Sequence, residues 1–418
     1  MPGIIAESLA RAHRPPAPDC LPWRRMRILV AHNAYRYRGG EDTVVEAELG
    51  LLRQHGHEVL LYRRDNAELD SIPRWRAALD SVWSRQTVLE VGGLLRRFRP
   101  HLIHAHNTFP LISPALYGIA ERYKIPVVQT LHNFRLLCPQ AMLMRNSRSC
   151  DDCVGRWPWR AVLHRCYRGS LAQSAVSAAT LSVHRVLGTW RNAVRRYIVL
   201  NSMGREIFIR GGLPADKLCI KPNFVNPPQV ALEGARAGGL FIGRLVPEKG
   251  LLTLAQAVQQ QPATRITVCG SGPLQHFVEQ AAGLDFLGFQ QGAALLQRLA
   301  SAAFLVMPSI AIESFGLAAI EAFACATPVI ASRQGGLRDI IEHGRNGLLV
   351  PPGDASALAD AIAYAVAHPA EMRRMGLEAY QTYLARYTPE RNYTTLMNIY
   401  DQALAPLPDS LLSKTIDA

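Results

Sequence analysis

Short runs of apolar residues alternate along the chain with longer segments rich in Ala, Leu and Arg. The runs have the length of buried strands, and the longer segments carry apolar residues at helical spacing. A parallel strand is buried on both faces and reads as a continuous apolar run, so the alternation predicts an α/β fold with parallel sheets. The runs predicted as strands are 26–33, 58–62, 100–107, 125–132, 196–202, 219–225, 240–243, 265–269, 285–289, 304–309, 327–331 and 346–350. The segments predicted as helices are 44–54, one or two within 73–99, 203–211, 251–259, 295–303, 317–324, 355–367 and 389–404.

This pattern breaks once in the middle of the chain, where Pro, Gly, Ala and charged residues follow no period. A chain of 418 residues is long enough for two or three domains. We therefore expect two Rossmann-like domains with parallel sheets that face each other across a cleft. The predicted segments are a disordered tail at 1–25, a first domain at 26–225 with an insertion at about 138–196, a linker at 226–239, a second domain at 240–387, a terminal helix at 388–405 that can cross back to the first domain, and a tail at 406–418.

The second domain opens with a strand, a glycine and two cations just before a helix. Gly243 lets a ligand approach the backbone, Arg244 can make a forked contact with a phosphate, and Lys249 can add a point charge. The next strand ends at Gly270, in a second tight turn. Together these residues predict a cradle for a diphosphate.

A second motif runs from Glu313 to Glu321 and joins a strand to a helix. Glu313 is predicted in the loop, and Glu321 more than one turn into the helix. Ser314, Phe315 and Gly316 would present backbone N–H groups at the helix start, where the helix dipole favours an anion. Two solvated glutamates on a surface helix remain an alternative for this motif taken alone.

Polar side chains in the first domain gather where its predicted strands end. In open α/β sheets this edge binds ligands. His132 is a candidate for contact with substrate, although a histidine at a strand end is also a common structural hydrogen-bonding group. The loop containing Gly39 and Gly40 lies between a strand and a helix and allows close approach of a phosphate or sugar. The strand-end residues are His32, Asn33, His106, Asn107 and His132.

The net charge of +13 comes almost entirely from arginine, with 41 Arg and 5 Lys. Residues 145–196 alone hold ten Arg and two Asp. A basic surface favours nucleic acid, a phospholipid headgroup layer or a phosphorylated substrate. No nucleic-acid-binding motif accompanies the charge, so we expect no nucleic-acid partner. Simple use of Arg on solvated faces accounts for part of the excess.

No apolar run approaches the ~20 residues of a membrane span, and residues 1–25 lack the apolar core of a signal peptide. We therefore expect a cytoplasmic protein.

Four of the eight cysteines fall inside the arginine-rich insertion. Their spacing, with eleven, two and twelve residues between successive cysteines, is compatible with a structural Zn²⁺ site in a reducing compartment. Unpaired or redox-labile thiols are the alternative, because only one Cys-x2-Cys pair is present. Cys269 and Cys325 lie in apolar runs and are predicted core residues. The candidate metal ligands are Cys138, Cys150, Cys153 and Cys166.

Several motifs appear in an order that resembles the family 4 retaining glycosyltransferases of the GT-B fold. The resemblance runs from about residue 26 to residue 404. It rests on Arg38-Gly-Gly-Glu41, Gly243-Arg-Leu-Val-Pro-Glu-Lys249-Gly250, Gly270-Ser-Gly-Pro273, the Glu313–Glu321 motif and Asn346-Gly-Leu-Leu-Val350.

The resemblance implies a role for each matching residue. Arg244 and Lys249 would hold the donor diphosphate, and Glu321 would accept hydrogen bonds from the ribose. Glu313 would face the donor sugar, and His132 would lie near the transferred sugar. Gly243, Gly270, Ser314, Phe315 and Gly316 would complete the nucleotide-sugar site, and Gly39 and Gly40 would close on it from the first domain. Asp339 stands where relatives commonly carry Glu and is left out of the predicted site.

The resemblance further implies a nucleoside-diphosphate sugar donor and retention of configuration. We expect no catalytic metal, because Arg244, Lys249 and the helix start at 314–316 can stabilise the leaving diphosphate. No residue is identified as a covalent nucleophile, so we expect a front-face attack guided by the leaving phosphate. The segment Leu131–Pro139 is similar to a bacterial polysaccharide-assembly subgroup, whose acceptor is a saccharide or polyprenyl-diphosphate-linked sugar. Trp157, Trp159, Tyr167 and nearby arginines would suit an anionic membrane surface at the inner face. A solvated cap is the alternative for that surface. A nucleotide-sugar epimerase of the same fold and a non-catalytic nucleotide-sugar binding protein are the rival functions.

Overall fold

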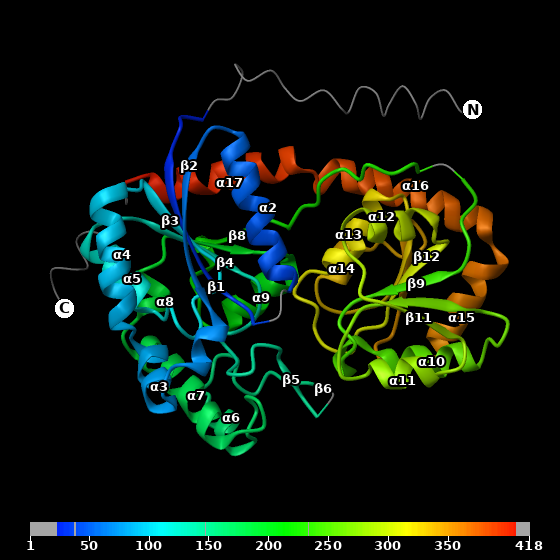
Figure 1. Ribbon diagram of the computed structural model, residues 1–418, viewed down its shortest axis with the longest axis horizontal. Helices are drawn as coiled ribbons and strands as arrows, with labels where there is room; N and C mark the ends of the chain where they lie inside the picture. The colour runs from blue at the N-terminus through cyan, green and yellow to red at the C-terminus, as the bar shows by residue number, and fades with distance from the viewer. Residues whose placement is uncertain (1–22, 37–38, 147, 233, 407–418) are drawn as a thin grey trace.

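The computed structural model describes residues 23–36, 39–146, 148–232 and 234–406. They form two α/β domains, each built on a six-stranded sheet in which every neighbouring pair of strands is parallel. Figure 1 shows the two domains side by side. The predicted fold class is therefore confirmed. The predicted disordered tails lie outside the described residues, apart from 23–25 and 406.

The first domain carries the sheet β2-β1-β3-β4-β7-β8 and a small hairpin. Strands β4 and β7 are neighbours in this sheet, but along the chain they are separated by the cysteine-rich segment. The hairpin and three helices belong to that segment. Its elements are β1 (Arg27–Ala34), α2 (Gly40–Gln54), β2 (Glu58–Asp65), η2 (Asn66–Asp70), α3 (Arg74–Val82), α4 (Arg85–Phe98), β3 (Leu102–Ala105), α5 (Ala115–Arg122), β4 (Val127–Leu131), β5 (Met144–Arg145), β6 (Arg148–Ser149), α6 (Trp159–Leu163), α7 (Leu171–Val186), α8 (Thr189–Asn192), β7 (Arg196–Val199), α9 (Ser202–Arg210), η3 (Ala215–Lys217) and β8 (Leu218–Ile220).

The second domain carries the sheet β11-β10-β9-β12-β13-β14. Numbered within the domain, this is the strand order 3-2-1-4-5-6 of dinucleotide-binding folds. Its elements are β9 (Gly239–Ile242), η4 (Pro247–Lys249), α10 (Leu251–Gln259), β10 (Ile266–Cys269), α11 (Gln275–Gln280), β11 (Leu284–Gly288), α12 (Gly292–Ser301), β12 (Phe304–Met307), α13 (Leu317–Ala324), β13 (Val329–Ser332), α14 (Leu337–Ile340), β14 (Gly347–Val350), α15 (Ala355–Ala367) and α16 (Pro369–Arg386), followed by α17 (Pro389–Leu404).

The apolar runs become central strands because both faces of each sheet are covered by helices. All four residues of β12 and of β13 are buried, as are all five of β4. Cys269 and Cys325 are 1% and 0% exposed, which confirms that they are core residues. Helices α13 and α16 pack together over one face of the second sheet, and α10 packs with α15 over the other (Figure 1). Among the described helices, none is both long and apolar enough to cross a membrane.

The last helix packs against the first domain, although it follows the second domain in sequence. Tyr393, Leu396 and Tyr400 of α17 share a hydrophobic cluster with Ile28 of β1 and Val128 of β4. In Figure 1 this helix, in red, lies alongside the first domain while α16 stays on the second. The chain therefore crosses between the domains twice, once before β9 and once between α16 and α17, so that two connections join the domains.

Polar contacts join the two domains at the carboxyl ends of their strands. Asn201, the N-cap of α9, donates from Nδ2 to the backbone oxygen of Ser314. The backbone N–H of Ser202 donates to Oδ2 of Asp339 at 2.6 Å. A cavity of about 10 Å³ lies at this boundary, lined from the first domain by residues such as Asn133 and from the second by Ser314.

Several predicted element bounds were wrong. Helix α2 begins at Gly40 rather than at 44, and β3 covers only Leu102–Ala105 of the predicted 100–107. Strand β8 ends at Ile220, because residues 221–225 already leave the sheet. The ends of a strand or helix depend on which backbone groups still have hydrogen-bonding partners, and local composition does not specify this.

Candidate nucleotide-sugar site

The predicted diphosphate cradle lies at the point where the strand order of the second sheet reverses. Strand β9 leads to Gly243, Arg244 and Lys249, and its neighbour β12 leads to Glu313. Ligands of open α/β sheets bind at such a reversal, outside the carboxyl ends of the strands. Gly250, with φ +75°, is essential to the geometry, because a Cβ there would lie 1.9 Å from the backbone oxygen of Pro308. This close approach brings Lys249 beside the loop that follows β12.

Lys249 and Glu313 form an ion pair in this loop. Lys249 Nζ donates to Glu313 Oε1, and Ser309 Oγ donates to the same oxygen at 2.6 Å. Burial alone would raise the pKa of Glu313, but the Lys249 ammonium and the two hydrogen bonds outweigh it and lower that pKa. Glu313 is therefore held as a carboxylate, and Lys249 is already positioned by it.

The other predicted cradle residues are close by but less constrained. The side chain of Arg244 is 66% exposed, with Nη2 3.6 Å from Glu248 Oε1, so its guanidinium is available to a ligand. Arg244 also contributes to lowering the pKa of Glu313. Gly270 lies directly against Gly243, because a Cβ on Gly270 would be 1.9 Å from the Gly243 backbone oxygen. The two glycine turns thus form one surface at the ends of β9 and β10.

The start of α13 faces the same region. Gly316 is the N-cap of this helix, and no described residue accepts a hydrogen bond from the backbone N–H of Ser314, Phe315 or Gly316. Such free N–H groups favour an anion. The Phe315 side chain instead packs into the core, edge-on to Tyr387 at 6.1 Å between ring centroids. Glu321 lies on α13, where burial raises its pKa to about 7.

The glycine loop of the first domain reaches this helix start. A Cβ on Gly40 would lie 4.0 Å from Leu317 Cδ2, in the first turn of α13. The backbone N–H of Gly39 donates to Oδ2 of Asp42 at 2.8 Å, which ties the loop to α2. The structure therefore brings Gly39 and Gly40 together with the predicted donor residues of the other domain.

The next residue in the loop, Glu41, was not among the predicted site residues. Tyr35 donates from its hydroxyl to Glu41 Oε2 at 2.8 Å, and Asn133 Nδ2 donates to the Tyr35 hydroxyl at 3.3 Å. Burial raises the pKa of Glu41 to about 7 against the lowering effects of His32 and Tyr35. A carboxyl group that titrates near neutrality is suited to acid–base chemistry. Its position directly after the paired glycines is the sequence signal that could have identified it.

His132 is hydrogen-bonded to a second buried histidine, which in turn faces Glu48. Its Nε2 lies 2.9 Å from His106 Nδ1, and His106 Nε2 lies 3.4 Å from Glu48 Oε1. Burial lowers the pKa of His132 well below its usual value and that of His106 to about 3, so both rings are neutral. Neither His106 Nε2 nor Glu48 Oε1 has a hydrogen-bond partner among the described residues, so their contact is electrostatic. An ionised Glu48 favours a proton on His106 Nε2, which leaves His106 Nδ1 to accept from a proton on His132 Nε2. His132 Nδ1 is then the nitrogen left free to accept.

Glu48 also forms the only group of three metal-ligand atoms within 4.8 Å of one another among the described residues, with His104 and His106. Lys221 Nζ lies 3.0 Å from Glu48 Oε2, and both side chains are only 2% exposed. Asn392 of α17 accepts a further hydrogen bond from Lys221 at 3.1 Å. The ammonium ion supplies the positive charge in this cluster, which we therefore interpret as a structural ion pair.

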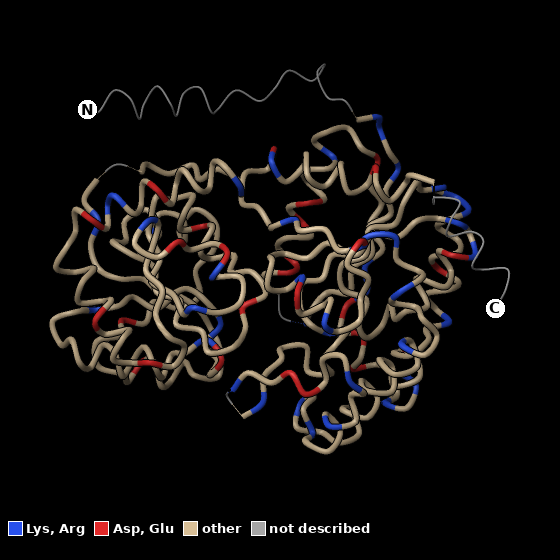
Figure 2. The backbone as a smooth tube through the Cα atoms, turned by 180° about the vertical axis from the view of Figure 1, so that it is seen from behind, with Lys and Arg blue, Asp and Glu red and all other residues tan. Residues whose placement is uncertain are grey.

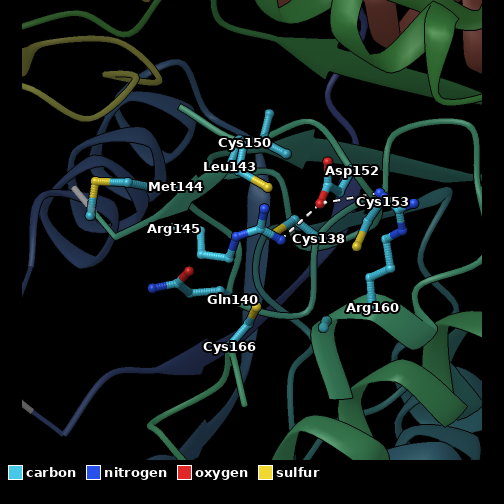
Figure 3. Close-up of a pocket in the computed structure, with 11 residues that line it drawn as sticks. Cys138, Gln140, Leu143, Met144, Arg145, Cys150, Asp152, Cys153, Arg160 and Cys166 are labelled. Atoms are coloured by element: carbon cyan, nitrogen blue, oxygen red, sulfur yellow. Dashed lines mark hydrogen bonds and ion pairs between the residues drawn. The ribbon is translucent and has the colours of Figure 1, made fainter. Parts of the chain in front are cut away.

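The four cysteines of the insertion line one small cavity (Figure 3). All four are free thiols. Burial, together with the neighbouring cysteines, raises the pKa of Cys153 to about 12 and raises that of Cys166. The structure thus brings Cys138, Cys150, Cys153 and Cys166 to one cavity, whose lining does not include Lys249 or Glu313.

The fold and site define a two-domain α/β protein of the GT-B type, with two Rossmann-like sheets whose strand ends meet. The family described as glycosyltransferase family 4 matches residues 38–229, and the family described as glycosyl transferases group 1 matches residues 228–382. The chain belongs to the family 4 glycosyltransferases.

Individual proteins agree with this assignment. The chain is 29% identical to a GDP-mannose-dependent alpha-mannosyltransferase of Mycolicibacterium smegmatis over 395 residues, covering 87% of this chain and 94% of that protein. It is 26% identical to the sulfoquinovosyl transferase of Arabidopsis thaliana over 361 residues, covering 79% of this chain and 64% of that protein. The matches with two further relatives span about half of each relative's length. The structure of Anabaena HepE in complex with UDP and glucose has the same fold, with a TM-score of 0.64, 18% identity, and coverage of 90% of this chain and 100% of that one.

Proposed function

We propose that this protein transfers a sugar from a nucleoside-diphosphate sugar to a saccharide or lipid-linked saccharide. The observation that carries the proposal is the Lys249–Glu313 pair at the reversal point of the second sheet, beside the free N–H groups that start α13. A pyrophosphate placed there would contact Arg244 and Lys249, and the sugar would lie by Glu313. The UDP in the complex of HepE supports a nucleotide donor for this fold.

The proposed chemistry needs no metal ion. As the bond between the anomeric carbon and the diphosphate breaks, negative charge grows on the leaving oxygen, and the sugar ring becomes positive. Arg244, Lys249 and the start of α13 would stabilise the leaving group, and such electrostatic stabilisation is usually the largest single catalytic contribution. We propose front-face attack with retention, in which the leaving phosphate guides the acceptor hydroxyl to the face of the sugar from which it departs.

His132 and Glu41 would act on the side of the sugar and acceptor. His132 Nδ1 is the ring nitrogen left to accept from a sugar hydroxyl, because Nε2 is engaged with His106. Glu41, with its pKa of about 7, would bind or deprotonate an acceptor hydroxyl. The Glu321 carboxyl would receive the ribose hydroxyls, which would favour its charged form.

For the acceptor we propose a polyprenyl-diphosphate-linked saccharide at an anionic membrane surface, which puts the enzyme in the cytoplasm, at the inner membrane face, in surface polysaccharide synthesis. Trp157 and Trp159 are 53% and 60% exposed, and Figure 2 shows blue Lys and Arg positions crowding that end of the first domain. Aromatic rings flanked by cations suit a headgroup layer. Tyr167, the third aromatic residue of the predicted surface, is only partly exposed, and its ring packs edge-on to Phe109 and beneath the Arg135 guanidinium.

The rival functions differ in what they predict. The family assignment favours a transferase over an epimerase, and a non-catalytic binding protein would bind the donor without hydrolysing it. A thermal-shift screen with UDP-, GDP- and ADP-sugars identifies the donor, and donor hydrolysis without acceptor tests for catalysis. Lys249→Ala and Arg244→Ala should each lower turnover by about 10²–10³-fold. Arg373→Ala, an exposed change on α16, is the matched control. Near-normal turnover of the Lys249 variant would contradict the proposal.

The membrane surface has its own test. Cosedimentation with vesicles of mixed zwitterionic and anionic lipid should recover the protein, and vesicles without anionic lipid should not. Replacing both Trp157 and Trp159 by Ala should lower the bound fraction, whereas Leu377→Ala, at a 51% exposed residue of α16, should not. Equal recovery with both kinds of vesicle, or none with either, would favour the solvated cap.

A further inference from the structure

The cysteine-rich segment between β4 and α7 converges on a single small cavity. Cys138 comes from the loop after β4, Cys150 follows β6, Cys153 lies in the next turn, and Cys166 follows α6. The cavity measures about 10 Å³, the room occupied by one water molecule or one ion. Figure 3 shows the sulfur atoms distributed around it. Three separate chain segments thus bring four thiols to the same cavity, two of them from the Cys150–Cys153 pair.

This segment contains little regular secondary structure, although Phe134, Leu137 and Leu143 pack into the core of the first domain. Its two strands, β5 and β6, are two residues long each, and a loop of this length with so little secondary structure is uncommon in a compact domain. Five of the nine described non-glycine residues with positive φ fall within it. Such conformations cost energy and persist only where surrounding structure enforces them. The five are Ala141, Leu143, Asn146, Arg165 and Arg168.

The charges around the cavity fit a negatively charged centre. Arg145 Nη1 lies 2.7 Å from Asp152 Oδ2, and Arg160 Nη1 lies 3.5 Å from the same oxygen. In Figure 3 the Arg145 guanidinium lies among the cysteines, with Asp152 beside it. The two guanidinium groups and the one carboxylate that line the cavity together carry a net positive charge. Four thiolates around a divalent cation would carry a net charge of −2, which this positive charge would offset.

We propose that Cys138, Cys150, Cys153 and Cys166 bind one structural zinc ion. Zn²⁺ would displace four protons to solvent, one from each thiol, and take four sulfur ligands in a closed tetrahedron. Zn–S bonds of about 2.3 Å hold sulfur atoms roughly 3.8 Å apart. In the structure no three of the described cysteine sulfurs lie within 4.8 Å of one another, so the ion would draw the thiols inward from the cavity wall.

The site would support the reaction by position and take no part in it. The segment begins at the loop that carries His132 and Asn133, and it folds back on that loop. The Phe134 N–H donates to the Ala141 oxygen at 3.0 Å, and the Cys138 N–H donates to the Phe134 oxygen at 2.9 Å. A metal that fixes Cys138 therefore fixes the loop next to the proposed sugar site.

Metal content tests this proposal without any assay of activity. The full-length protein, purified without chelator, should contain one zinc per chain by elemental analysis. Replacement with Co²⁺ should produce thiolate-to-metal charge transfer in the near ultraviolet and the intense visible bands of a tetrahedral sulfur site. Cys150→Ser and Cys153→Ser, tested separately, should each reduce retained zinc at least tenfold. Cys219→Ser, at a half-buried thiol outside the cluster, should retain it fully.

The opposite outcomes are equally clear. Metal-free protein in which all eight thiols titrate freely, or in which the four cysteines form disulfides, would overturn the proposal. Zinc retained in both serine variants would also overturn it. Because the Cys219 variant is matched in chemistry, loss of zinc confined to the cluster variants is not a general effect of replacing a cysteine by serine. A donor site that fails its own tests would leave these results unchanged.

Discussion

The buried pair of Glu48 and Lys221 gives a prediction that needs no knowledge of the substrate. Glu48 Oε2 lies 3.0 Å from Lys221 Nζ, and its other oxygen lies 2.9 Å from His104 Nδ1. Glu48→Gln keeps the shape and removes the charge, which leaves the ammonium with neutral amide oxygens, such as that of Asn392, and no anionic partner in this cluster. Breaking a buried pair from one side costs about 3–5 kcal/mol. If the first domain melts as a unit, its midpoint should fall by roughly 6–20 °C.

The pH dependence of this loss of stability follows from the direction in which folding shifts the pKa of Glu48. Burial alone would raise the pKa of Glu48, but Lys221 and His104 lower it well below 4.5. A depressed folded-state pKa stabilises the protein above the unfolded value, and this stabilisation is lost as pH falls through the folded value. The difference between the native protein and Glu48→Gln should therefore be constant from pH 5 to 7 and shrink below pH 4.5.

Urea denaturation followed by fluorescence at several pH values measures these differences. The double variant Glu48→Gln/Lys221→Met removes both charges and should lose less stability than the two single variants added together. Glu121→Gln, an exposed carboxylate on α5, should change the free energy of unfolding by less than about 0.5 kcal/mol. A loss below about 1 kcal/mol for Glu48→Gln at pH 7 would refute the ion pair.

Three further changes test the site and its scaffold. We expect kcat/KM of the native protein to rise with pH around a midpoint near 7, and Glu41→Gln should abolish that rise. Tyr35→Phe should move the midpoint to higher pH, because the Tyr35 hydroxyl lowers the pKa of Glu41. A pH profile unchanged in both variants would argue against Glu41 as a base. Gly250→Ala should cost about 2 kcal/mol or more in urea denaturation, because of its positive φ and the contact with Pro308, and a silent change would mean that the η4 turn is placed differently. Asn201→Ala should lower stability by about 1–2 kcal/mol through loss of the α9 cap and the domain bridge, whereas Asn201→Asp, which keeps the cap, should recover part of that loss.

Local pattern was enough for much of the second domain. Helices predicted at 251–259, 355–367 and 389–404 have those bounds in the structure. Glu313 lies in a loop and Glu321 in a helix, as predicted. These predictions succeeded because the spacing of apolar residues, and the Gly and Pro residues at the ends of an element, can be read from neighbouring positions in the sequence. The helix α16 was not predicted, and its residues have a weaker contrast between faces.

The first domain shows where such reasoning stops. His104 lies on β3 and His106 lies just past its end, and their rings are neighbours, 4.3 Å apart between centroids, a relation that their two-residue spacing suggests. Glu48 reaches these histidines from α2, 58 residues before His106, and Lys221 reaches Glu48 from the chain after β8, 115 residues after His106. No local period encodes that meeting, so the buried chain to His132 became visible only in the folded protein.

The sequence by itself determined the α/β class, the alternation of strand and helix, and which residue types stand at strand ends and helix starts. Tertiary structure alone decided that Lys249 meets Glu313, that Gly40 lies against Leu317, and that four cysteines share one cavity. The physical reason is that element type depends on neighbours in sequence, whereas the site depends on strand order and domain contact. Both arise from burial of apolar surface between segments far apart in the chain.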